Sequence, residues 1–343
     1  MTLVSLLLAA AFGWILHVGG LPLLPPQGSF ERLDLQYFAG FVVAMLAYMM
    51  TRFGRFHYLV ALIGPVPLRR IMTINAIALV LITFLPFRLG EVARPAMLRK
   101  KGVISAWAVT GTVAAERVLD GVVFSILLLA GLAIAVPHEP MPHHIGALPI
   151  PASLVTQGGK LAGLVFGGAF AMMVVFYWRR ALVVRLTERV LGILSSRLAG
   201  RVAEIVSRLS DGLKFLAVPR YSMPYLVVTL VSIVCEVWAF DLLAEAVGIP
   251  ELSFAQALVV LGLLAIGFAM PNAPGFFGTV QLVMYAGLAA YIAPDKVARE
   301  GASFVFLFYV TYLAIILVLA ALALIVEYAW PENADQEPAA DVR

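Results

Sequence analysis

Charged side chains interrupt two apolar runs in the N-terminal half of this sequence. Residues 86–95 read P-F-R-L-G-E-V-A-R-P, and the next apolar run contains A-A-E-R-V-L-D-G. The ionisable residues of these two stretches are Arg88, Glu91, Arg94, Glu116, Arg117 and Asp120. Because one guanidinium group holds two phosphate oxygens at once, arginines in such a setting are candidates for binding a phosphate.

The two stretches carry as many arginines as carboxylates. On a helix, Arg88, Glu91 and Arg94 would share roughly one face. A charge left unpaired at the centre of a bilayer costs about 2.5–3.5 kcal/mol on insertion scales, so these groups must pair or line water. Two interpretations stay open: a charge-paired knot that only joins two segments, and a polar cavity in which Arg88 contacts a ligand while Arg94 has a structural role.

Polar residues also interrupt the C-terminal half. Glu236 lies within the apolar run 223–247 without a basic neighbour in that run. It is either a protonated, hydrogen-bonded carboxyl, a proton-coupling group, or the partner of an arginine from the first half. A further run, 254–292, is interrupted by P-N-A-P-G-F-F-G-T-V-Q, which offers hydrogen bonds without charge. The candidate ligand-binding residues there are Asn272, Gly275, Gly278 and Gln281.

Composition defines the class of protein in which these residues act. The chain is 62% hydrophobic and 13% charged, whereas soluble domains average about 25% charged residues. It is therefore predicted to be an all-α polytopic membrane protein. Six runs are long enough to cross a bilayer as helices: 2–20, 36–51, 107–136, 158–178, 223–247 and 301–327. The basic residues lie beside these runs, as in cytoplasmic loops, so nucleic-acid binding is not expected.

Two further apolar segments, 71–100 and 254–292, contain Pro and Gly near their middle. Nine Lys and Arg lie within 179–220, four within 52–70 and none within 137–157. All basic loops fall on the cytoplasmic side only if 71–100 enters the membrane and returns. The predicted fold has six full transmembrane helices plus two re-entrant helical hairpins in an inverted repeat, with halves 2–136 and 158–327. Eight transmembrane helices are the alternative.

The remaining segments are predicted as follows. Residues 1–330 form a single transmembrane domain with both termini cytoplasmic, in a bacterial inner membrane. Residues 179–220 form an amphipathic segment on the anionic inner leaflet, and the acidic tail 331–343 is disordered. No nucleotide-binding fingerprint occurs, and neither a cofactor nor a metal site is predicted.

Taken in order, P-F-R-L-G-E-V-A-R-P, A-A-E-R-V-L-D-G and P-N-A-P-G-F-F-G-T-V-Q resemble the flippase-like family of the lysylphosphatidylglycerol synthase transmembrane region. The resemblance covers about residues 1–330. It aligns Arg88, Gly90, Glu91 and Arg94 with an R-x-G-E-x-x-R element, Glu116, Arg117 and Asp120 with E-R-x-x-D, and Pro274, Gly275 and Gly278 with P-G-x-x-G. Gln281 departs from the carboxylate that the family often carries there. Because the chain lacks the family's aminoacyl-transferase domain, synthesis of aminoacylated lipid is not expected.

The resemblance implies lipid translocation between leaflets. The expected ligand is a membrane lipid: an anionic phospholipid, a glycolipid, a polyprenyl-phosphate lipid or a hopanoid. It would enter an amphipathic cavity open sideways to the bilayer, with a lipid-biosynthetic enzyme as a possible partner. Two other functions remain open. One is a membrane-embedded transferase that binds Mg²⁺ through Glu91, Glu116 and Asp120, and the other is a non-catalytic subunit of a lipid-biosynthetic complex.

Overall fold

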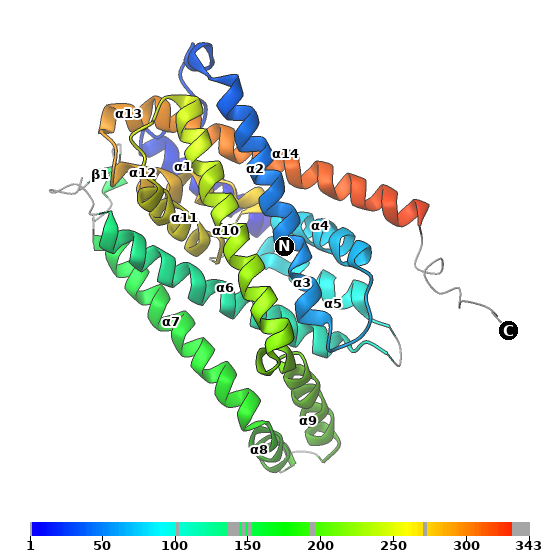
Figure 1. The fold of residues 1–343 in the computed structure, drawn as a ribbon. Helices are drawn as coiled ribbons and strands as arrows, with labels where there is room; N and C mark the ends of the chain where they lie inside the picture. Colours follow the sequence, from blue (N-terminus) through cyan, green and yellow to red (C-terminus); the bar gives the residue numbers. More distant parts are fainter. Residues whose placement is uncertain are drawn as a thin grey trace.

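The computed structural model describes residues 2–100, 103–135, 144–145, 148–149, 153–192, 196–269 and 273–330. This part of the chain is helical apart from two short antiparallel strands, β1 (His144–Ile145) and β2 (Leu148–Pro149) (Figure 1). Five helical segments are long and apolar enough to cross a membrane: Leu35–Val60, Ala106–Ile134, Gln157–Trp178, Pro219–Val247 and Pro294–Ala329. The prediction of an all-α polytopic membrane protein is confirmed.

The helical elements follow the apolar runs of the sequence. They are α1 (Thr2–Val18), η1 (Ser29–Arg32), α2 (Leu35–Gly54), α3 (Phe56–Val60), α4 (Leu68–Phe84), η2 (Pro86–Val92), α5 (Ala93–Leu98), α6 (Ala106–Ile134), α7 (Ser153–Trp178), α8 (Arg180–Gly192), α9 (Ser196–Asp211), η3 (Lys214–Ala217), α10 (Pro219–Val247), α11 (Phe254–Ala269), η4 (Pro274–Phe276), α12 (Thr279–Ala289), α13 (Pro294–Ala298) and α14 (Glu300–Ala329). The predicted span 2–20 corresponds to α1, which has 17 residues and is not among the five long segments.

Helices α2 and α10 lie side by side and run in opposite directions (Figure 1). At one end the Asp34 carboxylate caps α2 by accepting from the Gln36 N–H at 2.8 Å, and the Asp34 N–H donates to the Ala246 carbonyl at 3.0 Å. At the other end the Arg55 guanidinium donates to Thr229 Oγ1 at 3.1 Å. The start of each helix therefore lies at the end of the other.

The segment α4–η2–α5 leaves one end of the molecule and returns to it. Leu62 and Ile63, which precede α4, line the same groove as Arg99 and Lys100, which follow α5. The return depends on Gly90, where a Cβ atom would lie only 2.2 Å from the backbone of α4. The chain therefore folds back tightly against the last turn of α4, at the glycine of the R-x-G-E-x-x-R element.

The segment α11–η4–α12 does the same from the opposite end. Glu251, just after α10, forms an ion pair with Lys296, which follows α12. The turn needs glycines because Gly275 and Gly278 have φ values of +73° and +80°, which other residues rarely adopt. Phe84 at the end of α4 lies beside Gly275, so the turns of the two hairpins meet inside the molecule.

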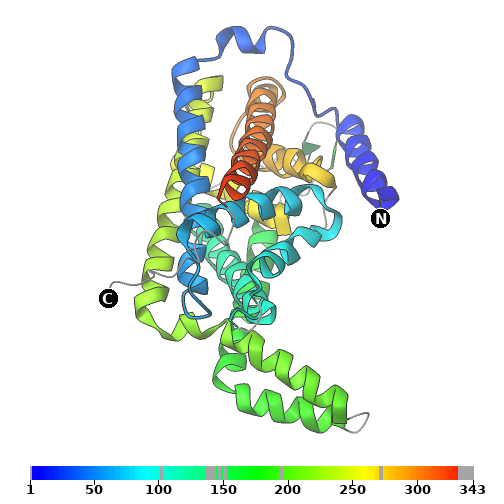
Figure 2. The same ribbon diagram turned by 90° about the vertical axis from the view of Figure 1, so that its right-hand side faces the viewer.

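The last long helix of each half packs against both hairpins. Helix α6 contacts α5 of its own half and α11 of the other half. Helix α14 likewise contacts α12 of its own half and α4 of the other half. The amphipathic prediction for 179–220 corresponds to α8 and α9, a helical hairpin that projects from one end of the molecule (Figure 2). The predicted disordered tail, 331–343, lies outside the described residues.

Candidate functional site

A cavity of about 550 Å³ lies between the two hairpins and the long helices α2, α6, α10 and α14. Its polar wall consists of Tyr48, Arg52, Glu91, Arg94, Arg117, Asp120, Glu236 and Tyr312. Its apolar wall comes from α4, α6, α7, α11 and η4 and includes Leu79, Ile82, Phe124, Leu128, Phe268 and Phe276. The cavity is therefore amphipathic, with charged groups on one side and hydrocarbon and aromatic rings on the other.

The carboxylates of α6 are held by an arginine from the end of α2. Glu116 and Asp120 are four residues apart, so they lie on one face of α6. Arg55 donates to Glu116 Oε1 at 3.2 Å and to Asp120 Oδ2 at 2.6 Å. The Cζ atom of its guanidinium lies 5.4 Å from the centroid of the Tyr225 ring. Because Arg55 is only 4% exposed, this is a buried ion pair that fixes α2 against α6 and α10.

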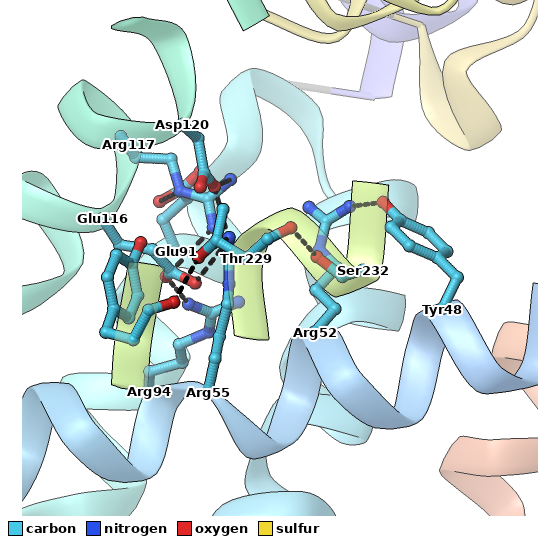
Figure 3. A network of polar contacts seen from close by, with 11 residues as sticks. Tyr48, Arg52, Arg55, Glu91, Arg94, Glu116, Arg117, Asp120, Thr229 and Ser232 are labelled. Atoms are coloured by element: carbon cyan, nitrogen blue, oxygen red, sulfur yellow. Dashed lines mark hydrogen bonds and ion pairs between the residues drawn. The ribbon is translucent and has the colours of Figure 1, made fainter. Parts of the chain in front are cut away.

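Two more arginines reach Glu116 (Figure 3). Arg94 of α5 forms an ion pair with Glu116 Oε2 and lies over the Phe56 ring, 5.1 Å from its centroid. Arg117 lies 3.1 Å from Glu116 Oε2 and 3.9 Å from Glu91 Oε2. Glu116 therefore meets three guanidinium groups, and this knot joins the first hairpin to α2 and α6.

Arg52 stands apart from that knot. It lies one helical turn before Arg55 on α2, and Figure 3 shows its guanidinium turned toward Tyr48, to whose hydroxyl it donates a hydrogen bond. Among the described residues, Arg52 makes no ion pair with a carboxylate, whereas Arg55, Arg94 and Arg117 each make at least one. Its positive charge is thus the least neutralised among the described arginines of the cavity.

The cavity also contains carboxylate oxygens without donors. Within the described part of the chain, Asp120 Oδ1 and Glu236 Oε2 are buried and accept no hydrogen bond. A buried acceptor without a donor costs about 1–3 kcal/mol. The cavity therefore presents one guanidinium that can donate further hydrogen bonds and two carboxylates that each have an oxygen without a donor. A polar ligand that carries both an acceptor and a donor group would complement it.

Most of the charged residues predicted from the sequence come together here. Glu91, Arg94, Arg117, Asp120 and Glu236 line the cavity, and Glu116 lies directly behind it. The Arg88 side chain and the whole of Asn272 lie outside the described part of the chain. Whether these residues bind a substrate stays a prediction.

The predicted polar residues of the second hairpin have a different place. Gln281 Oε1 accepts a hydrogen bond from the Gly278 N–H at 2.7 Å, which closes the turn at the start of α12. Gly278 lies against Phe12 of α1, where a Cβ atom would be 2.1 Å from the Phe12 Cβ. Gly275, Gly278 and Gln281 are not among the residues that line the cavity, so the described geometry gives them a role in shaping the turn.

Sequence reasoning missed four residues of this site: Tyr48, Arg52, Arg55 and Tyr312. Arg52 and Arg55 were counted among loop charges because the second apolar run was taken to end at residue 51. Helix α2 continues to Gly54, which places Arg52 on the cavity wall and Arg55 beside the carboxylates of α6. The available signal was the spacing of Tyr48, Arg52 and Arg55, which puts all three near one face of a helix that continues the run.

The described residues contain no group of three or more His, Cys, Asp or Glu side chains placed to hold a metal ion. Two of the carboxylates at the site, Glu116 and Asp120, share Arg55 as their partner. The arginines and carboxylates of the site are suited to binding charged and hydrogen-bonding groups of a ligand.

Fold and site together define an integral membrane protein that encloses an amphipathic cavity with a paired charge cluster. The chain belongs to the family of the lysylphosphatidylglycerol synthase TM region, which matches residues 2–320. No curated protein and no solved structure matches the chain. The resemblance expected from the three motifs is thus confirmed, and it links the protein to a membrane domain associated with lipid.

Proposed function

We propose that this protein moves a phosphate-bearing lipid between the leaflets of a bacterial inner membrane. The observation that carries the proposal is Arg52, a cavity arginine that forms no ion pair with a carboxylate among the described residues. A lipid phosphate would bind to Arg52 beside Tyr48 while the acyl chains extend along Phe124, Phe268 and the aliphatic wall. A phosphate accepts charge-assisted hydrogen bonds from a guanidinium, which are roughly twice as strong as neutral ones.

The two carboxylate oxygens without donors favour a lipid whose headgroup can donate hydrogen bonds. Asp120 Oδ1 and Glu236 Oε2 would accept hydrogen bonds from an amine or from hydroxyl groups on the headgroup. The ligand is therefore a phospholipid or glycolipid whose headgroup carries such donors next to its phosphate. Polyprenyl-phosphate lipids that carry a sugar meet the same requirement, and hopanoids without phosphate do not.

The membrane arrangement proposed here has six crossings and two re-entrant hairpins in an inverted repeat. Its support is that each hairpin starts and ends at one end of the molecule, and that α2 and α10 relate the two ends. In the eight-helix alternative, Leu62 and Arg99 would lie on opposite sides of the membrane. In the proposed arrangement with two re-entrant hairpins, the broken backbone at both turns would lie near the midplane of the membrane, where irregular backbone is tolerated only if protein shields it or it lines a wet cavity.

Transport is preferred over a metal-dependent transferase because of the partners of the carboxylates. Glu116 meets three guanidinium groups, and Asp120 receives Arg55 at 2.6 Å. Mg²⁺ is held by carboxylates that are free to face it, and a competing guanidinium already neutralises both of these groups. An accessory role without transport predicts that a charge change at Arg52 has no effect on lipid movement.

The test uses the full-length protein reconstituted into phosphatidylcholine vesicles with traces of tail-labelled fluorescent lipids. Fluorescence in the outer leaflet is removed by a membrane-impermeant reductant, and the slower loss reports movement from the inner leaflet. Labelled phosphatidylethanolamine and phosphatidylglycerol should move, and labelled ceramide should move at the same rate with and without protein. Arg52→Gln should slow the phospholipids about tenfold or more, because a hydrogen bond to a charged group contributes about 1.5–3 kcal/mol.

Arg299→Gln is the matched control, since it removes an arginine whose side chain is 62% exposed outside the cavity. Its transport should equal that of the unchanged protein. Two results would overturn the proposal: phosphate-bearing lipids that stay protected under every gradient applied, or equal transport by Arg52→Gln and Arg299→Gln. Mass spectrometry of the same vesicles distinguishes a transferase, which would leave a chemically altered lipid.

A further inference from the structure

A second cavity, of about 960 Å³, lies at the end of the molecule where the first hairpin begins and ends. Three parts of the chain line it: the turn after α3, the residues between α5 and the first turn of α6, and α9 with the residues that follow it. Its cationic residues are Arg99, Lys100, Arg201, Arg208 and Lys214, and its carboxylates are Glu204 and Asp211. We call it the basic groove.

The pairs within the basic groove leave a surplus of positive charge. Arg208 binds Glu204 at 2.7 Å, and Lys214 binds Asp211 at 2.9 Å, so these charges are neutralised locally. The remaining cations are Arg99, Lys100 and Arg201, none of which forms an ion pair within the described part of the chain. Three cations from two separate segments, the one after α5 and α9, therefore line one groove without a carboxylate partner among the described residues.

The two walls of the groove are fixed to each other by a close crossing of backbones. At Gly111 of α6, a Cβ atom would lie 2.2 Å from the Leu209 carbonyl oxygen. At Gly212, a Cβ atom would lie 2.2 Å from the Ala108 carbonyl oxygen. Because each glycine lets the other backbone approach, the end of α9 packs closely against the start of α6, so the helix that carries Arg201 lies beside the segment that follows Arg99.

Apolar side chains lie beside the cations. Leu62, Val103 and Trp107 line the groove and are 38%, 53% and 46% exposed, respectively. Tryptophan is enriched at the level of lipid headgroups because its ring is amphipathic. A surface with unpaired cations next to exposed Trp, Val and Leu fits a molecule with an anionic head and a hydrocarbon chain.

We propose that the basic groove binds one anionic phospholipid of the inner leaflet as a resident ligand. Its phosphate would contact Arg99, Lys100 and Arg201, and one acyl chain would lie along Trp107 and Val103. The occupant follows from charge and place: the loops that form the groove are those predicted to be cytoplasmic, and the inner leaflet carries anionic lipid. None of the groove residues lines the cavity between the hairpins, so this site is independent of the proposed transport.

The test is native mass spectrometry of the full-length protein, delipidated in detergent and titrated with phosphatidylglycerol or phosphatidylcholine of identical chains. The protein should bind one phosphatidylglycerol in clear preference to phosphatidylcholine. The double variant Arg99→Gln/Arg201→Gln should bind that lipid roughly thirtyfold more weakly, since each of the two basic residues near an anionic surface contributes about 1 kcal/mol. Soluble glycerol 3-phosphate should bind far more weakly than the lipid, because it lacks the chain.

The matched control is Arg185→Gln/Arg189→Gln, which removes two exposed arginines of α8 that do not line the groove. It should bind phosphatidylglycerol as the unchanged protein does, and both variants should keep the unchanged thermal midpoint. Equal loss in the two double variants would overturn the proposal, since it would reveal only general attraction to charge. Equal binding of both lipids, equal binding of glycerol 3-phosphate, or preferential binding of polyglutamate would also overturn it.

Discussion

The two hairpins of this protein occupy equivalent positions but carry different chemistry. Each starts and ends at its own end of the molecule, and each packs against the last long helix of both halves. The first hairpin contributes Glu91 and Arg94 to a buried charge cluster. The second hairpin contributes Phe268 and Phe276 to the apolar wall, and its polar residue Gln281 closes its own turn.

The difference indicates that both hairpins shape the cavity, whereas only the first contributes charged side chains to it. A lipid needs both kinds of wall, because its headgroup is polar and its chains are not. Because the buried charges lie on one wall of the cavity, the opposite wall is apolar, and the charges are close enough to form ion pairs. The charge of the second hairpin is instead at its exposed base, where Glu251 binds Lys296.

The largest expected effect is at the first hairpin. Glu116→Ala would leave Arg55, Arg94 and Arg117 buried around a lost carboxylate. Removing one partner of a buried ion pair costs about 3–5 kcal/mol, because the remaining charge has no compensation. We expect a strongly lowered midpoint of thermal unfolding for the full-length protein in detergent, measured by tryptophan fluorescence.

Glu31→Ala is the control for that experiment, because Glu31 is exposed in η1. It should leave the midpoint unchanged. A Glu116→Ala midpoint that matches this control would show that the charge knot does not hold the first hairpin, and the contrast between the hairpins would lose its basis.

A smaller effect is expected at the second hairpin. Gln281→Ala removes the acceptor of the Gly278 N–H, and one such hydrogen bond contributes about 1 kcal/mol to stability. Transport of fluorescent phospholipid should stay at the unchanged rate, because Gln281 does not line the cavity. A loss of transport as large as that of Arg52→Gln would instead make the neutral hairpin part of the binding site.

The sequence predicted the charged half of this contrast better than the neutral half. A charge in an apolar run must find a partner or line water, so Arg94 and Glu116 were expected to do so, and they form an ion pair. The uncharged side chain of Gln281 and the glycines near it do not need a charged partner from another helix. Their hydrogen bonds can be made within the turn itself, as the one from the Gly278 N–H to Gln281 is. Gln281 was therefore expected in the cavity and lies in the turn.

The positions of helix ends were the other source of error. Arg52 and Arg55 appeared to be loop residues because hydropathy falls where arginines begin, whereas the backbone of α2 continues to Gly54. Tertiary pairing with Asp120 and the ring of Tyr225 compensates for burying Arg55 there. No local pattern contains that partner, since it lies on another helix. Pro and Gly within the apolar runs, together with the charges of the loops, predict that these segments return to the side they enter from, and the number of spans and re-entrant hairpins stays a prediction.

The smallest effect is expected at the exposed base of the second hairpin. The Lys296 ammonium, which donates a hydrogen bond to Glu251, holds the pKa of that carboxyl below its ordinary value. A lowered pKa adds stability above the unfolded pKa of about 4.3, and this stability is lost as the pH falls through the folded pKa. Glu251→Gln should therefore lower the thermal midpoint by about 1 °C or less at pH 7, as exposed ion pairs do. The difference from the unchanged protein should vanish in a series of melts taken down to about pH 3, where both forms lack the charge. A difference at pH 7 of several degrees would mean that this pair is not screened by solvent, and the hairpins would then differ less than their burial indicates.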